Sequence, residues 1–165
     1  MQFPAEAALW FLPFVLPLCA VAALTDLRSM RIPNWCVDAL GAVYVLLGLL
    51  VMPSWADYGW QLLHLPIGLV IGFLMYALSL IGAGDAKFAG AAAPYVAVAD
   101  LSDLGMIFAI TLIVGFIAHR IARHSPLRRL APDWKSWEAG KKFPMGLCLG
   151  ATLAIYLCLA AFGSA

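Results

Sequence analysis

The sequence predicts an all-α protein that crosses a membrane with about six helices. Of its 165 residues, 64% are hydrophobic and only 12% are charged, whereas a soluble domain is about 25% charged. The mean hydropathy is +0.94. A soluble domain of this size could not hide so many apolar side chains from water. The composition therefore excludes a soluble enzyme and a disordered chain, and a net charge of +1 gives no sign of a nucleic-acid partner.

Six apolar stretches have the length expected of a membrane-spanning helix, which is roughly 20 residues. They are expected at 7–24, about 35–52, about 60–81, a fourth stretch ending near 99, 104 to about 119, and 143–162. The loops between these stretches are short, and the sequence shows no internal repeat. Residues 1–165 are therefore expected to form a single transmembrane domain.

The fourth span is too short if it contains uncharged residues only. Residues 88–99 separate Lys87 from Asp100, and these 12 residues cover roughly 18 Å at about 1.5 Å per residue. The hydrocarbon core of a bilayer is about 30 Å thick. A spanning helix must therefore include residues before Phe88, which draws Asp85 and Lys87 below the membrane surface.

All ten basic residues fall on one side of the predicted spans. They are Arg28, Arg31, Lys87, Arg120, Arg123, Arg128, Arg129, Lys135, Lys141 and Lys142. The opposite side carries only acids, at Glu6, Asp57, Asp100 and Asp103. Because cytoplasmic loops are rich in Lys and Arg, we expect the basic side to face the cytoplasm and both termini to lie outside it.

The basic segment after the fifth span also carries apolar side chains at helical spacing. They are Leu127, Leu130, Ala131, Trp134 and Trp137. We expect a short amphipathic stretch on the inner leaflet, with its basic face toward the lipid headgroups. A helix that binds a partner protein is the alternative.

Cysteine and histidine give no sign of a metal site or a cofactor. The four cysteines form no CxxC pair, and the three histidines are far apart in the sequence. Buried cysteines in a membrane protein are usually small apolar side chains. We therefore expect neither a metal nor a cofactor.

Two acids on the basic side have no clear structural role. Asp26 directly follows the first span, and Asp85 ends the stretch Gly82-Ala-Gly-Asp. An acid below the membrane surface is costly unless it faces a wet cavity or a partner, so it indicates function. The structural alternatives are an ion pair of Asp26 with Arg28 or Arg31, and an ion pair of Asp85 with Lys87 or a helix cap.

The other acids are given surface or capping roles. Asp38 is expected in the first turn of the second span, where a negative charge complements the helix dipole. Asn34, which follows Pro33, is expected to cap the same helix. Lys87 is expected either to extend its amine to the headgroups, or to act on Asp85 or on an acidic group of a substrate.

Two carboxylates that share one proton can activate a water molecule against an amide carbonyl. One acts as the base, while the protonated one donates to the carbonyl oxygen. Asp85 precedes a predicted helix and lies near Lys87, and both favour its ionised form. We therefore expect Asp85 to be the base and Asp26, at the end of a helix, to be the protonated partner.

Three short stretches occur in a characteristic order along the chain. Residues 26–34 read Asp-Leu-Arg-Ser-Met-Arg-Ile-Pro-Asn, an acid followed by a basic stretch and Ile-Pro-Asn. Residues 82–85 form a GxGD pattern with a lysine two residues later, and residues 143–146 read Phe-Pro-Met-Gly. In these stretches the sequence resembles the type IV prepilin peptidases, over roughly residues 20–152.

The resemblance implies a peptidase that cuts a prepilin after a glycine at the cytoplasmic membrane face and removes a short basic leader. The catalytic pair would be Asp26 and Asp85. The matching positions expected to support this pair or to bind substrate are Gly82, Gly84, Lys87, Pro33 and Asn34.

The long members of this family carry a cysteine-rich insert after the first span, which is linked to zinc and to methylation. Here the first span leads almost directly to Asp26, so the chain is similar to the short form of tight-adherence (Flp-type) pilus systems. The resemblance therefore implies a peptidase without methyltransferase activity. It also implies a multi-pass protein of the bacterial inner membrane, with the lipid bilayer, a membrane-embedded prepilin and the pilus assembly machinery as partners.

Two other functions are compatible with the composition. A small proton- or ion-coupled transporter could use Asp26 and Asp85 as ion ligands, but no repeat relates the two halves and both acids lie at one end of the spans. A membrane scaffold of the pilus machinery without catalysis is the third possibility, and the two intact acids argue against it.

Overall fold

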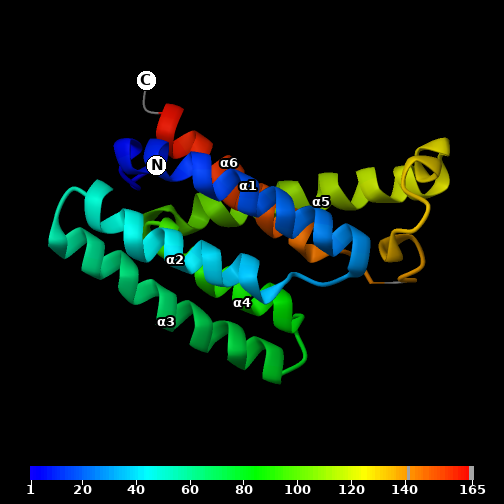
Figure 1. The fold of residues 1–165 in the computed structure, drawn as a ribbon, viewed down its shortest axis with the longest axis horizontal. Coiled ribbons are helices and arrows are strands. Elements are labelled where there is room, and N and C mark those ends of the chain that lie inside the picture. The colour runs from blue at the N-terminus through cyan, green and yellow to red at the C-terminus, as the bar shows by residue number, and fades with distance from the viewer. Residues whose placement is uncertain (141, 164–165) are drawn as a thin grey trace.

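The computed structural model describes residues 1–140 and 142–163, and over these residues it contains six α-helices and no strand. Figure 1 shows them as a helical bundle. The helices are α1 (Ala5–Ser29), α2 (Asn34–Val51), α3 (Trp55–Ala77), α4 (Ala83–Ala92), α5 (Leu101–His124) and α6 (Met145–Phe162). Short 3₁₀ helices lie between α4 and α5, η1 (Ala93–Tyr95) and η2 (Val98–Asp100), and between α5 and α6, η3 (Pro126–Leu130) and η4 (Lys135–Trp137). The all-α prediction is confirmed.

Five of the helices are long and apolar enough to cross a membrane: α1, α2, α3, α5 with the turn before it, and α6. The fourth predicted span differs. As predicted, α4 begins before Phe88 and contains Asp85 and Lys87, but it ends after ten residues. Pro94 follows in the 3₁₀ helix η1, and a proline supplies no N–H to continue an α-helix. At the position of the fourth predicted span, the structure therefore has a short helix followed by turns.

The third helix begins five residues before its predicted start. Ser54 caps it by accepting a hydrogen bond from the Asp57 N–H at 3.1 Å, as serine does at many helix N-termini. Helix α3 ends at Ala77 instead of near residue 81, and a tight turn with Ser79 at a positive φ of 59° leads to α4. This turn sets where the Gly-Ala-Gly-Asp stretch begins.

Helices α1 and α6 form the most extensive pair in the bundle. Gly150 allows their backbones to approach closely, because a Cβ atom there would lie 2.7 Å from the Cys19 carbonyl oxygen. Small residues at helix crossings are typical of membrane bundles, where van der Waals contact rather than water exclusion holds helices together. This contact fixes the end of α1, which carries Asp26, beside the start of α6.

Helices α3 and α4 are packed by the same principle. A Cβ atom at Gly72 would lie 2.7 Å from the Ala86 carbonyl oxygen, and one at Gly68 would lie 2.9 Å from the Cβ of Ala93. Across the contact, a Cβ atom at Gly90 would lie 2.9 Å from the Leu69 backbone nitrogen. These three glycines hold the short α4 against α3 and so fix the position of Asp85.

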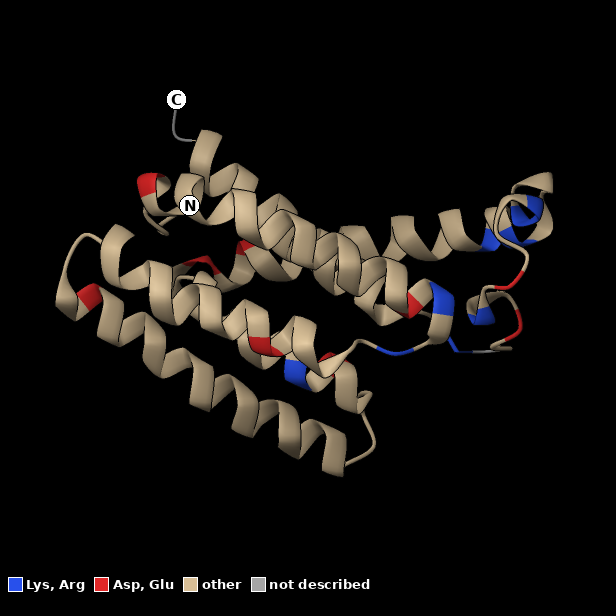
Figure 2. Ribbon diagram, viewed as in Figure 1, with Lys and Arg blue, Asp and Glu red and all other residues tan. Residues whose placement is uncertain are grey.

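Most basic residues gather at one end of the bundle, whereas acidic residues occur at both ends. In Figure 2 the Lys and Arg ribbon gathers where α1 and α5 end, and the N-terminus and the end of α6 lie at the other end.

The basic segment is not one helix: it forms η3 and η4, with Pro126 and Pro132 interrupting it. Trp137 is buried and stacks on His119 and on Trp134. Lys141 lies outside the described residues.

Asp100 does not have the surface role expected of it. Its side chain is buried, at 3% exposure, and it accepts hydrogen bonds from the Gln2 N–H at 2.7 Å and the Tyr156 hydroxyl at 2.7 Å. The Phe3 N–H donates to it at 3.3 Å. The 3₁₀ helix η2 turns the carboxylate inward, where it holds the N-terminal segment against α6.

Candidate active site

Asp26 lies in the last turn of α1 and points into the protein. It is 5% exposed, and its Oδ2 accepts the Gly146 N–H at 2.7 Å. Gly146 is the second residue of α6, where backbone N–H groups have no partner within the helix. The start of α6 thus supplies a donor and a favourable dipole to the carboxylate at the end of α1.

Gly146 belongs to the site, although it was not among the predicted site residues. A Cβ atom there would lie 2.9 Å from Asp26 Cβ, 3.0 Å from Ile32 Cδ1 and 3.1 Å from Asp26 Oδ2. Any larger residue would push the carboxylate away. The sequence signal was the Phe-Pro-Met-Gly stretch, but the pattern alone does not reveal a contact between residues 120 positions apart.

Asp85 is the third residue of α4, and its carboxylate lies back over the start of its own helix. A Cβ atom at Gly82, the N-cap, would lie 2.7 Å from Asp85 Oδ2. An acid at this helix position commonly reaches back toward the N-cap. Gly84 is less constrained, because a Cβ atom there would meet its nearest neighbour, Ile32, at 3.5 Å.

One cavity of about 700 Å³ contains both acids in its wall. All seven residues predicted for the site line it: Asp26, Pro33, Asn34, Gly82, Gly84, Asp85 and Lys87. The remaining wall comes mainly from the end of α1 and the loop to α2. Residues more than 50 positions apart in the sequence therefore share one space at the basic end of the bundle.

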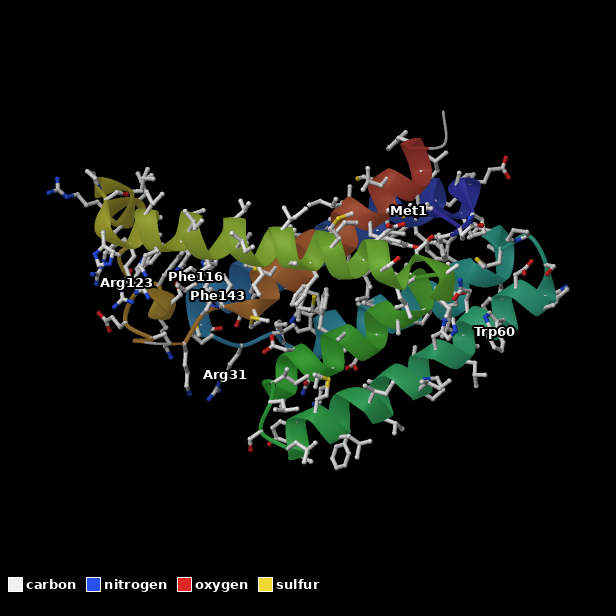
Figure 3. All side chains as sticks on the ribbon, turned by 180° about the vertical axis from the view of Figure 1, so that it is seen from behind. Met1, Arg31, Trp60, Phe116, Arg123 and Phe143 are labelled. Atoms are coloured by element: carbon white, nitrogen blue, oxygen red, sulfur yellow. The ribbon has the colours of Figure 1, made fainter. Side chains whose placement is uncertain are left out.

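The loop between α1 and α2 brings the two acids into this arrangement. Met30 has a positive φ of 56°, the left-handed conformation that commonly ends a helix, and its N–H donates to the Asp26 carbonyl at 2.8 Å. The chain then turns so that Ile32 is buried, close to both Gly84 and Gly146. The Arg31 side chain extends away from the bundle (Figure 3).

Neither acid forms the ion pair that would give it a purely structural role. Over residues 1–140 and 142–163, the single ion pair joins Arg128 and Glu138 at 3.6 Å. Asp85 lies in a helix too short to span the membrane, and its pKa is raised to about 6 by burial and then by the charge of Asp26. The two carboxyl groups are therefore close enough to influence each other electrostatically.

Two expectations for the neighbouring polar residues are wrong. Asn34 does not cap α2: it is the first helical residue after Pro33, and its Oδ1 accepts a hydrogen bond from Lys87 Nζ at 3.1 Å. Asp38 is not in the first turn, because α2 begins at Asn34 and Asp38 is its fifth residue. The Lys87 amine is therefore directed to Asn34 instead of Asp85.

The residues that the structure describes contain no group of three or more His, Cys, Asp or Glu side chains that could hold a metal ion. Cys19, Cys36 and Cys148 are buried among the helices as free thiols. Asp26 and Asp85 are the two acids in the cavity wall, where they lie with the Lys87 amine and the Asn34 amide.

A match to a family model shows which protein family this chain belongs to. The model described as the type IV leader peptidase family matches residues 13–121. The chain belongs to this family. The matched stretch contains Asp26, the loop to α2 and the Gly-Ala-Gly-Asp start of α4, so most of the cavity wall lies within it.

The match to the leader peptidase family ends at residue 121, before α6. Gly146, which donates its N–H to Asp26, therefore lies outside the matched residues. No curated protein and no solved structure matches this chain. Family membership makes the protein a peptidase with a prepilin-type protein substrate, and the spanning helices make it a multi-pass membrane protein.

Proposed function

We propose that this protein is an aspartic endopeptidase that removes the short basic leader of Flp-like type IV prepilins. It cuts after a glycine at the cytoplasmic face of the bacterial inner membrane, with Asp26 and Asp85 as the catalytic pair. The observation that carries the proposal is the shared cavity of about 700 Å³, which brings both acids together at the end of the bundle where the basic residues gather.

We assign the two roles in the opposite way to the expectation from the sequence. Asp26 accepts a backbone N–H, which suits a carboxylate acting as the base on a water molecule. Asp85 has a raised pKa, which suits the acid that donates to the carbonyl oxygen of the cut bond. Lys87, which was expected to keep Asp85 ionised, donates its hydrogen bond to Asn34 instead.

In this mechanism Asp26 takes a proton from water as the oxygen attacks the peptide carbonyl. Asp85 gives its proton to the carbonyl oxygen, and the tetrahedral intermediate then releases the amine of the mature pilin. As the intermediate collapses, the proton gained by Asp26 passes to the leaving amine, and a hydroxyl of the intermediate returns a proton to Asp85 as the new carboxyl group forms. The loop between α1 and α2, residues 30–33, has no room for a further domain, which supports a peptidase without methyltransferase activity.

Reconstitution in lipid vesicles with a Flp-type prepilin tests the proposal. The wild-type protein should release the leader, whereas Asp26→Asn and Asp85→Asn should each stop cleavage. Asp133→Asn is the matched control, because Asp133 is an exposed acid outside the cavity. Cleavage that persists in both cavity variants would exclude the aspartyl mechanism, and an inactive wild type would exclude this substrate.

A further inference from the structure

A second cavity opens beside the proposed catalytic cavity. Its volume is about 530 Å³, and it lies between α2 and α3 with α4 as its floor. Asn34 and Lys87 line both cavities, and these two side chains are hydrogen-bonded to each other. The second cavity, here called the α2–α3 groove, therefore adjoins the space that holds Asp26 and Asp85, with Asn34 and Lys87 between the two.

The groove has a polar side and an otherwise mostly apolar wall. Asn34 and Lys87 lie on the side shared with the catalytic cavity and Asp38 follows Asn34 along α2, whereas leucines of α3 and small residues of α2 and α4 line the rest. Gly41 and Ala91 are among these small residues, and small residues let another chain approach a helix backbone closely. The groove thus suits a peptide segment that is mostly apolar and carries a charged side chain at one end.

Asp38 is the feature of this groove that packing does not explain. It lies one helical turn beyond Asn34, roughly 6 Å farther along α2, and its side chain is exposed. Within the described part of the chain it has neither an ion-pair partner nor a side-chain hydrogen bond. An acid at a membrane-spanning helix is costly unless a partner neutralises it. The basic residue of the groove, Lys87, already donates to Asn34.

We propose that Asp38 positions the substrate by pairing with a Lys or Arg side chain next to the bond to be cut, while the α2–α3 groove holds the adjoining segment. This inference rests on the proposed peptidase function. A carboxylate without a protein partner on the polar side of a groove attracts a cation, and for a peptide substrate that cation is a basic side chain. Asp38 acts on the position of the substrate and does not touch the reacting atoms.

Binding and cleavage measurements separate this inference from the proposed function. Two prepilins are compared, one with its natural leader and one in which every leader Lys and Arg is replaced by Gln. With the natural prepilin, Asp38→Asn should raise KM about tenfold, as loss of a partly desolvated ion pair does, and leave kcat unchanged. With the neutral leader, Asp38→Asn should change nothing, and Asp133→Asn should behave as wild type with both substrates.

The same comparison is made by binding alone, with labelled prepilins and the Asp85→Asn background. Weaker binding of the natural prepilin on Asp38→Asn supports the inference even if the wild type cleaves neither substrate. A charge exchange completes the test: Asp38→Lys should prefer a prepilin whose leader bases are replaced by Glu. Equal binding of natural and neutral prepilins by the wild type would overturn the inference, and so would an Asp38→Asn variant in which only kcat falls. The groove would then be a surface that lipid chains cover.

Discussion

At the residue scale, the two glycines of the Gly-Ala-Gly-Asp stretch have different roles. The Asp85 carboxylate lies over Gly82, where a Cβ atom would come within 2.7 Å of Oδ2, whereas Gly84 has ordinary contact distances. Gly82→Ala should therefore displace the carboxylate without disturbing the core. We expect its kcat to fall about a hundredfold, as a misplacement of about 1 Å does, with an unchanged unfolding temperature.

Gly84→Ala is the matched control for this prediction. It adds the same methyl group two residues away and should keep kcat within a few fold of wild type. Leader release and thermal unfolding are measured for both variants in the same detergent. Equal losses of activity in the two variants would mean that the stretch is needed for flexibility rather than for room around Asp85.

The proton on Asp85 gives a second prediction at this scale. Its pKa is raised to about 6, because burial and the neighbouring Asp26 charge both disfavour its ionised form. If Asp85 is the acid, kcat/KM should fall as the pH rises through about 6. Isotope-edited infrared spectroscopy should show the protonated carboxyl band of Asp85 disappearing over the same range.

Asp26→Asn removes the neighbouring charge and should move this infrared transition to lower pH. Asp103→Asn, at the other end of the bundle, should leave it in place. If the infrared transition of Asp85 stays at the same pH when Asp26 is replaced, the two carboxyl groups do not interact. That result would remove the basis for a shared proton.

The sequence alone identified Asp26 and Asp85 as unusual because their positions left them without surface roles. It could not assign Gly146 and Asn34 correctly, because each contacts a residue far away in the sequence. It misplaced Asp38 because the position of this residue in α2 depends on where the helix begins. The Gly146 contact with Asp26 and the Asn34 contact with Lys87 arise only when α1, α2, α4 and α6 assemble. Local patterns carry no information on such pairs.

At the element scale, hydropathy predicted the long helices because their apolar runs match the thickness of a membrane. It did not predict that α4 ends after ten residues, because this depends on Pro94 and on packing against α3. The short helix is held where α3 presents Gly68 and Gly72. The position of Asp85 thus depends on the glycines of another helix as much as on its own sequence.

Two glycines of α3 test this dependence. A Cβ atom at Gly72 would lie 2.7 Å from the Ala86 backbone oxygen, whereas one at Gly59 would meet nothing within 4 Å. Gly72→Ala should destabilise the protein by about 1–3 kcal/mol, since backbone must move, and should lower leader release by shifting α4. Gly59→Ala should keep full activity and gain slightly in stability, because alanine favours a helix.

Unfolding in mixed micelles and the cleavage assay measure both effects. Unchanged activity in a destabilised Gly72→Ala protein would show that α4 reaches its place without close contact to α3. Activity lost in both variants would point instead to a general sensitivity of α3.

At the scale of the whole molecule, acids at the two ends of the bundle have different surroundings: Asp26 and Asp100 are buried, whereas Asp85 is half-buried. Asp26 and Asp85 face a cavity of about 700 Å³ at the basic end, whereas Asp100 at the other end is satisfied by donors of the protein itself. Burial of an acid is therefore not by itself a sign of catalysis. What distinguishes Asp26 and Asp85 is that they line a cavity, which under the proposed function receives substrate and water.

Asp100→Asn should separate stability from activity on this basis. The substitution replaces one acceptor oxygen by an NH₂ group among the Gln2 and Phe3 N–H groups and the Tyr156 hydroxyl, and buried donors left without acceptors cost about 1–3 kcal/mol. We expect a lower unfolding temperature and faster proteolysis near the N-terminus, with an unchanged kcat below that temperature. Asp103→Asn, the neighbouring acid, should leave all three quantities as in wild type. A loss of kcat in a fully stable Asp100→Asn protein would instead connect the two ends of the bundle, and the reaction would then depend on the N-terminal segment as well as on the cavity.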